Sequence, residues 1–220
     1  ETMKLLLEAG GLDVNCEDDV SPATTPLVAA SQAGQLDNVA YLLSFPEIDV
    51  NLGQPPPLVI ATSLGFQGIV DLLLAHPNID VNVQSSEGYT ALAEAVHGNW
   101  AEIFRSLINH PACDVNAGQY PPITLAARFS RDALFIKLLS HPNIDINAED
   151  NGWHDPQSGS RQTACRLACM ICFPKPRESD LFTRHRRTAL AWAVEFCDTS
   201  MIRLLLEQDH ISQSLPAAFA

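Results

Sequence analysis

Basic residues are scarce in this chain. It has 13 Lys and Arg residues against 26 Asp and Glu residues, which gives a formal net charge of −13 at pH 7. General binders of DNA or RNA need a surplus of cationic side chains to neutralise phosphates, and proteins that dock on anionic membranes need the same surplus. The composition therefore argues against a nucleic-acid-binding protein and against a protein that sits on a membrane surface.

Long apolar runs are absent as well. No stretch approaches the roughly 18 consecutive apolar residues of a membrane-spanning helix. Aromatic residues make up only 7% of the chain, yet 46% of it is hydrophobic and 18% charged, which is the composition of a globular protein. The sequence begins at Glu1 inside an expected helix and without an initiator Met, so we expect a monomer or a part of a larger chain.

Cysteine is present but has no regular spacing. The six residues are Cys16, Cys113, Cys165, Cys169, Cys172 and Cys197. A secreted disulfide framework is typical of short chains with regularly spaced cysteines, which this chain is not. We therefore expect a reduced protein inside the cell, in the cytoplasm or the nucleus.

A tripeptide of Asp, Val or Ile, and Asn recurs through the first two thirds of the chain. Its copies begin 31 to 36 residues apart, at Asp13, Asp49, Asp80, Asp114 and Asp145. An aliphatic residue stands six positions before each Asp. Self-similarity at this period predicts a row of supersecondary units, each of which buries its apolar face only against its neighbours.

Each period carries the signals of two short helices. A Thr or Pro opens a segment rich in Leu and Ala in five places: Thr25-Pro26, Pro56-Pro57, Thr90-Ala91, Pro121-Pro122 and Thr188-Ala189. Thr can cap the first free amides of a helix, and Pro fits the first helical turn. Nine residues later stands a residue expected to end the helix: Gly34, Gly65, Asn99, Ser130 or Cys197. A second helix with aliphatic spacing follows, and in four periods a Pro forbids its continuation.

These segments resemble the ankyrin repeat, which pairs two short antiparallel helices with a β-turn and carries a Thr-Pro-Leu-His-x-Ala signature. The resemblance covers residues 1–148 and 188–211. It implies an all-α solenoid of helix-turn-helix units, with a partial repeat at 1–15 and repeats at about 25–51, 56–82, 90–116, 121–147 and 188–214. The signature His is replaced by Val28, Val59, Ala93, Thr124 and Ala191, so we expect aliphatic packing to carry more of the cohesion between repeats.

The regular pattern is interrupted before the last repeat. From Asp145 to Thr188 is 43 residues, whereas the same step takes 7 to 12 residues elsewhere. We therefore expect an inserted loop at 148–187 that contains one short helix with cysteines. Seven of the 13 basic residues lie in 161–187. This basic segment could bind an acidic or phosphorylated partner, or it could fold back on the acidic repeats; the sequence leaves both open.

The cysteines of the insertion raise the question of a metal. Cys165, Cys169 and Cys172 share one face of a helix, where buried thiols behave as small hydrophobic groups. The alternative is a structural zinc site completed by His154 or His185. We favour the first interpretation and predict no metal and no cofactor.

Two histidine patterns also have plain structural interpretations. Glu94-x-x-His97 is half of a di-metal carboxylate motif, but the second half is missing, so we favour an exposed pair on a first helix. His76, His110 and His141 recur at the ends of second helices, where a cation is mildly favourable. Their spacing along a row of repeats is too large for shared metal ligation.

The ankyrin resemblance implies a non-catalytic module that binds a protein partner. Partners of this family usually contact the concave groove, formed by first helices and hairpin tips. On this chain that register gives twelve positions: Ile60, Leu64, Tyr89, Glu94, His97, Tyr120, Leu125, Arg128, Phe129, Trp192, Glu195 and Phe196. The alternative is an enzyme or small-molecule-binding protein on the same scaffold, with 148–187 as a lid and His154, His185, Glu94 and His97 as its first functional residues.

Overall fold

The computed structural model describes residues 13–17, 24–150, 188–196 and 198–207. These residues form ten short helices, and between them the only strand-like pairing is a single antiparallel bridge from Gln84 to Thr90. The chain divides into two compact units, Glu1–Gly118 and Gln119–Ala220, called unit 1 and unit 2 below.

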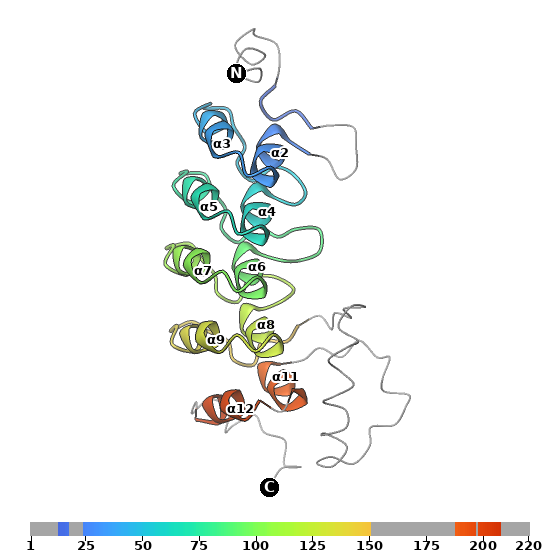
Figure 1. Cartoon of the computed structure of the whole chain (residues 1–220), viewed down its shortest axis with the longest axis vertical. Coiled ribbons are helices and arrows are strands. Elements are labelled where there is room, and N and C mark those ends of the chain that lie inside the picture. The colour runs from blue at the N-terminus through green and yellow to red at the C-terminus, as the bar shows by residue number, and fades with distance from the viewer. Residues whose placement is uncertain (1–12, 18–23, 151–187, 197, 208–220) are drawn as a thin grey trace, which may run out of the picture. The chain divides into compact units, whose positions relative to one another are not determined.

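Unit 1 is a stack of three helix pairs. They are α2 (Pro26–Gln32) with α3 (Leu36–Leu42), α4 (Pro57–Ser63) with α5 (Gln67–Leu74), and α6 (Ala91–His97) with α7 (Ala101–Ile108). The first helices α2, α4 and α6 form one layer, and the second helices α3, α5 and α7 form the other (Figure 1).

Unit 2 contains two pairs of the same kind. They are α8 (Pro122–Arg128) with α9 (Asp132–Leu139), and α11 (Ala189–Glu195) with α12 (Thr199–Leu206). Helix α8 packs on α11 although 60 residues, 151–187 among them, lie between the end of α8 and the start of α11. The expected all-α architecture of helix pairs is confirmed. The predicted insertion with its cysteine helix, and most of the predicted partial repeat at 1–15, lie outside the described residues.

The helices begin where the sequence signals predict. The hydroxyl oxygens of Thr25 and Thr90 each accept the amide N–H three residues on, at 3.2 Å, and Thr188 does the same at 3.4 Å. These bonds satisfy one of the free amides of the first turn. Pro57 and Pro122 instead occupy the first helical position, where a missing amide hydrogen costs nothing.

The predicted breakers adopt left-handed backbone angles. The φ angles are +67° at Gly34, +75° at Gly65, 59° at Asn99 and 50° at Ser130. Each residue follows directly after the C-cap of a first helix and reverses the chain into the second helix. Cys197, the fifth predicted breaker, lies outside the described residues.

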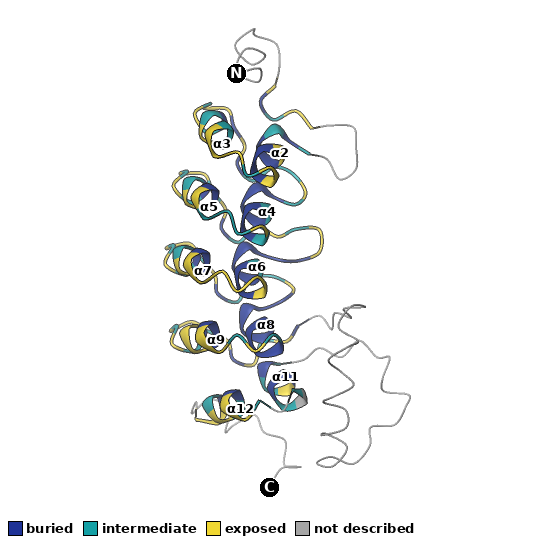
Figure 2. Ribbon diagram, viewed as in Figure 1, coloured by how far each residue is buried: buried dark blue, intermediate teal, exposed yellow. Residues whose placement is uncertain are grey.

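Burial differs between the two layers. The first helices are buried over most of their surface, whereas the second helices bury one stripe and expose the rest (Figure 2). Leu27, Leu58 and Leu92 hold the same place in successive first helices and are almost fully buried. Each such side chain stabilises the stack by about 1.5–3 kcal/mol relative to an exposed one. Since these contacts join consecutive repeats, aliphatic packing does hold unit 1 together.

Polar cohesion is also present, and it comes from the recurring tripeptide. The Nδ2 of Asn51 donates to the carbonyl of Asn78 in the next repeat at 2.9 Å, while its Oδ1 accepts the amide of Asp80 at 2.8 Å. Asn15 and Asn82 make the same pair of bonds to their following repeats. In each copy the Asp carboxylate accepts the amide of its own Asn, and the central Val is buried. An asparagine ladder thus adds hydrogen bonds that the sequence interpretation did not anticipate.

Candidate partner-binding surface

Three of the predicted contact residues come together in unit 1. The rings of Tyr89 and His97 stack with their centroids 6.3 Å apart and their planes 24° from parallel. Glu94 lies one turn before His97 on α6, and its Oε2 is 3.7 Å from the His97 Nδ1. This distance is too long for a strong hydrogen bond. His97 is exposed and Glu94 is partly so, as expected for a pair on a first helix.

The aromatic residues expected at the hairpin tips are buried. In unit 1 the Ser85 amide donates to the Tyr89 carbonyl and the Gly88 amide to the Ser85 carbonyl, so the chain reverses at Ser86 and Glu87. Those two residues are exposed at the tip, whereas Tyr89 lies in its buried base. Tyr120 of unit 2 is buried too. Ser86 and Glu87 are therefore the tip residues that the sequence interpretation missed.

Four further predicted residues gather in unit 2. The Arg128 guanidinium carbon lies 4.8 Å from the centroid of the Trp192 ring and 5.2 Å from that of Phe129. Trp192 in turn stacks on Phe196, with centroids 5.8 Å apart and planes 12° from parallel. A guanidinium at these distances is attracted by the negative faces of the rings. Helices α8 and α11 therefore present one cation–aromatic cluster.

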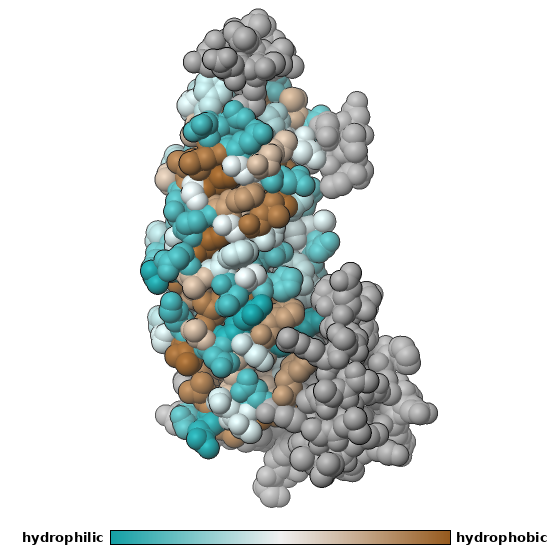
Figure 3. Space-filling view, in the orientation of Figure 1, coloured by the Kyte–Doolittle hydropathy of each residue, from teal (hydrophilic) through white to brown (hydrophobic). Residues whose placement is uncertain are grey.

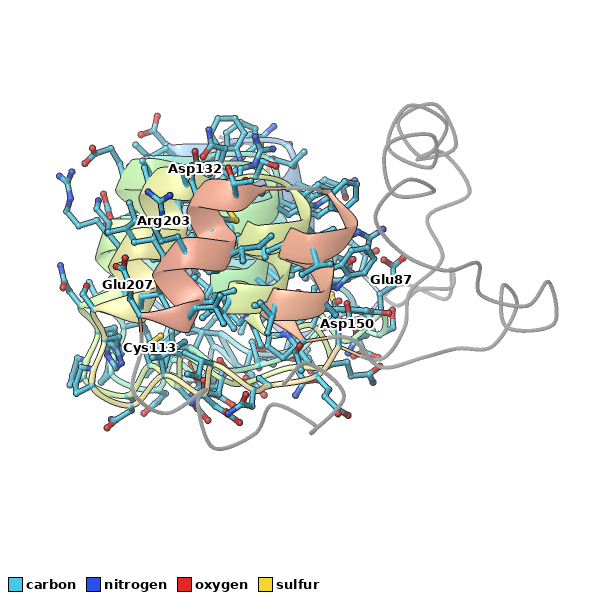
Figure 4. All side chains as sticks on the ribbon, turned by 90° about the horizontal axis from the view of Figure 1, so that it is seen from below. Glu87, Cys113, Asp132, Asp150, Arg203 and Glu207 are labelled. Carbon is cyan, nitrogen blue, oxygen red and sulfur yellow. The ribbon has the colours of Figure 1, made fainter. Side chains whose placement is uncertain are left out.

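Asp150 completes this cluster, and sequence reasoning missed it. The indole Nε1 of Trp192 donates to the Asp150 Oδ2 at 2.6 Å, and the carboxylate residue is only 1% exposed. Figure 4 shows Asp150 beside α11. The available signal was weak: polar residues stand five positions after the Asp of every tripeptide copy, at Asp18, Gln54, Ser85, Gln119 and Asp150.

Burial separates the predicted residues into two groups. Leu125, Arg128 and Trp192 are buried, because α8 packs against both α9 and α11. These side chains lie beneath the accessible surface and do not form part of it. Ile60, Phe129 and Phe196 are partly exposed, and Leu64 is 44% exposed at the end of α4. Glu195 lies on α11, and its side chain falls outside what the structure describes.

The repeated histidines make the same contact in three successive repeats. In each of His76, His110 and His141 the Nδ1 accepts the amide N–H of the residue two positions on, at 3.3 Å. The ring nitrogen therefore acts as a hydrogen-bond acceptor in the turn after the second helix.

Metal-ligating side chains do not cluster in the described residues. No group of three or more His, Cys, Asp or Glu side chains there could hold an ion. Cys165, Cys169, Cys172, His154 and His185 lie outside those residues, so the zinc alternative and the lid alternative stay untested predictions. The described helices also include none with the length and apolar character needed to cross a membrane.

The visible face of the molecule carries no single chemical character. Hydrophobic and hydrophilic side chains alternate over its surface (Figure 3). Comparison with protein families gives one match: the model described as ankyrin repeats (3 copies) aligns with residues 1–85 and again with 58–150. No curated protein matches the chain. The helix pair α11–α12 lies beyond the matched residues and has the same construction as those within them.

Proposed function

Because this chain belongs to the ankyrin-repeat family, we propose that it is a non-catalytic module that binds a protein partner through its first helices and hairpin tips. Ankyrin repeats generally serve protein–protein interaction. One observation supports this use most directly: side chains at the ends of the first helices remain accessible in both units. Leu64 and His97 are exposed in unit 1, and Phe129 and Phe196 are partly exposed in unit 2.

The supports beneath these side chains are rigid. In unit 1 the asparagine ladder and the buried leucines join consecutive repeats. In unit 2 Phe129 contacts the Arg128 guanidinium and Phe196 stacks on the Trp192 ring. Rigid aromatic anchors lose little conformational entropy when a partner binds, which is why they dominate interface energetics. We propose an intracellular location as well, since Cys16 and Cys113 are both free thiols.

A matched set of variants tests the proposal. The double variant Leu64→Ser with Phe129→Ala removes one accessible anchor from each unit. Ile136→Ser is the control, because Ile136 is 51% exposed but lies on the second helix α9. Proteins captured from cell lysate by the wild-type chain are quantified by mass spectrometry for all three. We expect the double variant to lose them and Ile136→Ser to keep them.

The outcome that contradicts this proposal is equally definite. If the double variant retains its helical circular dichroism and captures the same proteins as the wild type, the first helices are not the binding surface. An enzyme with 148–187 as its lid gains no support from the described residues, since Glu94 and His97 form a pair on the surface of α6 whose nearest side-chain atoms are 3.7 Å apart.

A further inference from the structure

A strip of apolar side chains stays uncovered on unit 1, at the edge where first helices turn into second helices. It consists of Leu36 at the start of α3, Leu64 and Phe66 between α4 and α5, and Trp100 just before α7. Leu36 is 46% exposed and Trp100 39% exposed, and Phe66 is partly buried. We call these four residues the turn ridge; only Leu64 among them belongs to the surface considered above.

Close contacts between neighbouring repeats make the ridge continuous. A Cβ added to Gly34 would lie 2.9 Å from the Phe66 ring, and one added to Gly65 would lie 2.8 Å from the Trp100 ring. Each aromatic ring therefore rests on the backbone of the repeat before it. Leu36 reaches in the opposite direction, to 3.3 Å from a Cβ placed on Gly68 of the next repeat. Leu36, Phe66 and Trp100 thus each reach a neighbouring repeat, and together they link three repeats.

The glycines keep this arrangement in place. Gly34 and Gly65 have positive φ angles, and they leave no side chain between the ring and the backbone below it. The ring atoms nearest these glycines therefore lie close against the backbone of the preceding repeat. A continuous exposed apolar patch of this kind is a feature of interaction sites rather than of an ordinary soluble surface.

The net charge of unit 1 favours one class of partner for the turn ridge. Residues 1–118 hold 15 acidic and two basic residues, whereas residues 119–220 hold 11 of each, so the whole net charge of −13 belongs to unit 1. Within 24–118 the single basic residue is Arg105, which pairs with Glu102 at 2.8 Å. Exposed Asp37 follows Leu36 directly, and Glu102 stands two residues after Trp100. The ridge therefore lies in a unit whose charged side chains are mostly acidic.

We propose, building on the interaction function above, that the turn ridge binds a basic amphipathic peptide segment of a partner protein. Its apolar side chains would cover Leu64, Phe66 and Trp100, and its Lys or Arg residues would face Asp37 and Glu102. Repeats about 10 Å apart give a ridge of about 20 Å, which matches a helix of about 14 residues with apolar anchors at i, i+3 or i+4, i+7 and i+11. A second copy of this chain is a poor occupant, since two acidic units repel each other.

The probe is a phage-displayed library of random 16-residue peptides, selected on the wild-type chain of 220 residues. Peptides that also bind the variant Leu64→Ser with Trp100→Ala are removed by counter-selection. We expect the survivors to be enriched in Lys and Arg and to carry apolar residues at helical spacing. Survivors that are acidic or neutral overturn the proposal.

Affinity measurements on one selected peptide test the geometry. Measured by fluorescence anisotropy, the double variant Leu64→Ser with Trp100→Ala should bind the peptide at least tenfold more weakly. The double variant Asp37→Asn with Glu102→Gln should bind it several-fold more weakly. A rise in salt from 50 to 300 mM should also weaken binding of the wild type several-fold. Ile136→Ser should bind like the wild type. Equal binding by all variants, or equal binding of a scrambled peptide of the same composition, overturns the proposal. If the Trp100 variant does not fold, Leu36→Ser with Leu64→Ser replaces it, since both side chains are about half exposed.

Two further experiments distinguish the possible occupants of the ridge, and separate the ridge proposal from the proposed interaction function. A peptide of residues 161–187 that binds the ridge more tightly than every selected peptide would assign the ridge to the chain's own segment and overturn the assignment to a partner. If no peptide is selected on the ridge while Leu64→Ser with Phe129→Ala abolishes lysate capture, the ridge proposal fails and the interaction function stands. If lysate capture is lost in Leu36→Ser with Trp100→Ala but is unaffected by Phe129→Ala alone, the ridge is the site and the first-helix surface is not.

Discussion

Trp192 and Asp150 lie 42 residues apart in sequence and share a 2.6 Å hydrogen bond from the indole Nε1 to the carboxylate Oδ2. The bond fastens the last residue described before 151–187 to the first helix described after that segment. Both partners are buried, so the indole donor compensates part of the cost of removing a carboxylate from water. The construction of unit 2 therefore depends on a polar contact at the point where the repeat pattern is interrupted.

Replacing Trp192 should show how much this hydrogen bond contributes to the free energy of unfolding. Trp192→Phe keeps an aromatic ring for Arg128 and Phe196 but removes the donor to Asp150. A buried carboxylate that loses a donor costs about 1–3 kcal/mol of unfolding free energy. Calorimetry or urea unfolding should show this loss for Trp192→Phe. The variant Trp100→Phe changes the same residue type at an exposed site and should lose less than half as much; equal losses would contradict the role given to the hydrogen bond.

The asparagine ladder makes a second prediction. Asn82→Ala removes two hydrogen bonds between repeats, one to the Ala112 carbonyl and one from the Asp114 amide. At about 1 kcal/mol per bond, we expect a loss of about 2 kcal/mol in urea unfolding. Asn109→Ala, an exposed position at the C-cap of α7, should change stability by less than about 0.5 kcal/mol. If the two variants unfold at the same urea concentration, the ladder contributes nothing to cohesion.

Most of the fold was predictable because its signals are local. Thr25 caps the helix that follows it, Gly34 ends that helix nine residues on, and both act through their own backbone neighbours. The ladder was not predictable in this way. Whether Asn51 reaches the Asn78 carbonyl depends on the distance between two stacked repeats, which no property of the tripeptide itself reveals.

The candidate site was predictable only in part, for a related reason. Counting positions from the helix start places Leu125 and Arg128 on an outward face, but α8 is covered by both α9 and α11, so both side chains are buried. Leu64 and Phe129, which the same count selects, do remain accessible. Asp150 had only the weak signal of a polar residue five positions after the Asp of each tripeptide copy, and Trp100 lies outside the register that the family resemblance supplied.

Substitutions at two residues with left-handed backbone angles should change the stability of the chain in opposite directions. Gly65→Ala should destabilise the chain by more than 1 kcal/mol, because the new Cβ meets both a positive φ of +75° and the Trp100 ring at 2.8 Å. Ser130→Gly should instead stabilise it by up to about 1 kcal/mol, since glycine adopts the φ of 50° without a steric penalty. Thermal unfolding of the two variants should shift in opposite directions; a shift in the same direction would show that backbone strain is not the dominant effect.

Cys113 gives the prediction that depends on pH. Burial, and to a lesser extent the charge of Asp114, raise the pKa of its thiol from 9.0 to about 11 (Figure 4 marks the residue). The thiolate is the reactive form, so alkylation of Cys113 by iodoacetamide should be slow at pH 8 and should accelerate only as the pH approaches 11.

The same pKa shift predicts how stability depends on pH. Below pH 9 both the folded and the unfolded chain hold the proton of the Cys113 thiol. Between pH 9 and 11 only the unfolded chain releases it, so stability should fall over that window. Peptide mapping at successive pH values measures the first effect, with exposed Cys16 as the comparison. Urea unfolding of the wild type and of Cys113→Ser measures the second, and a fall in stability that is equally steep in the variant would assign it to other groups.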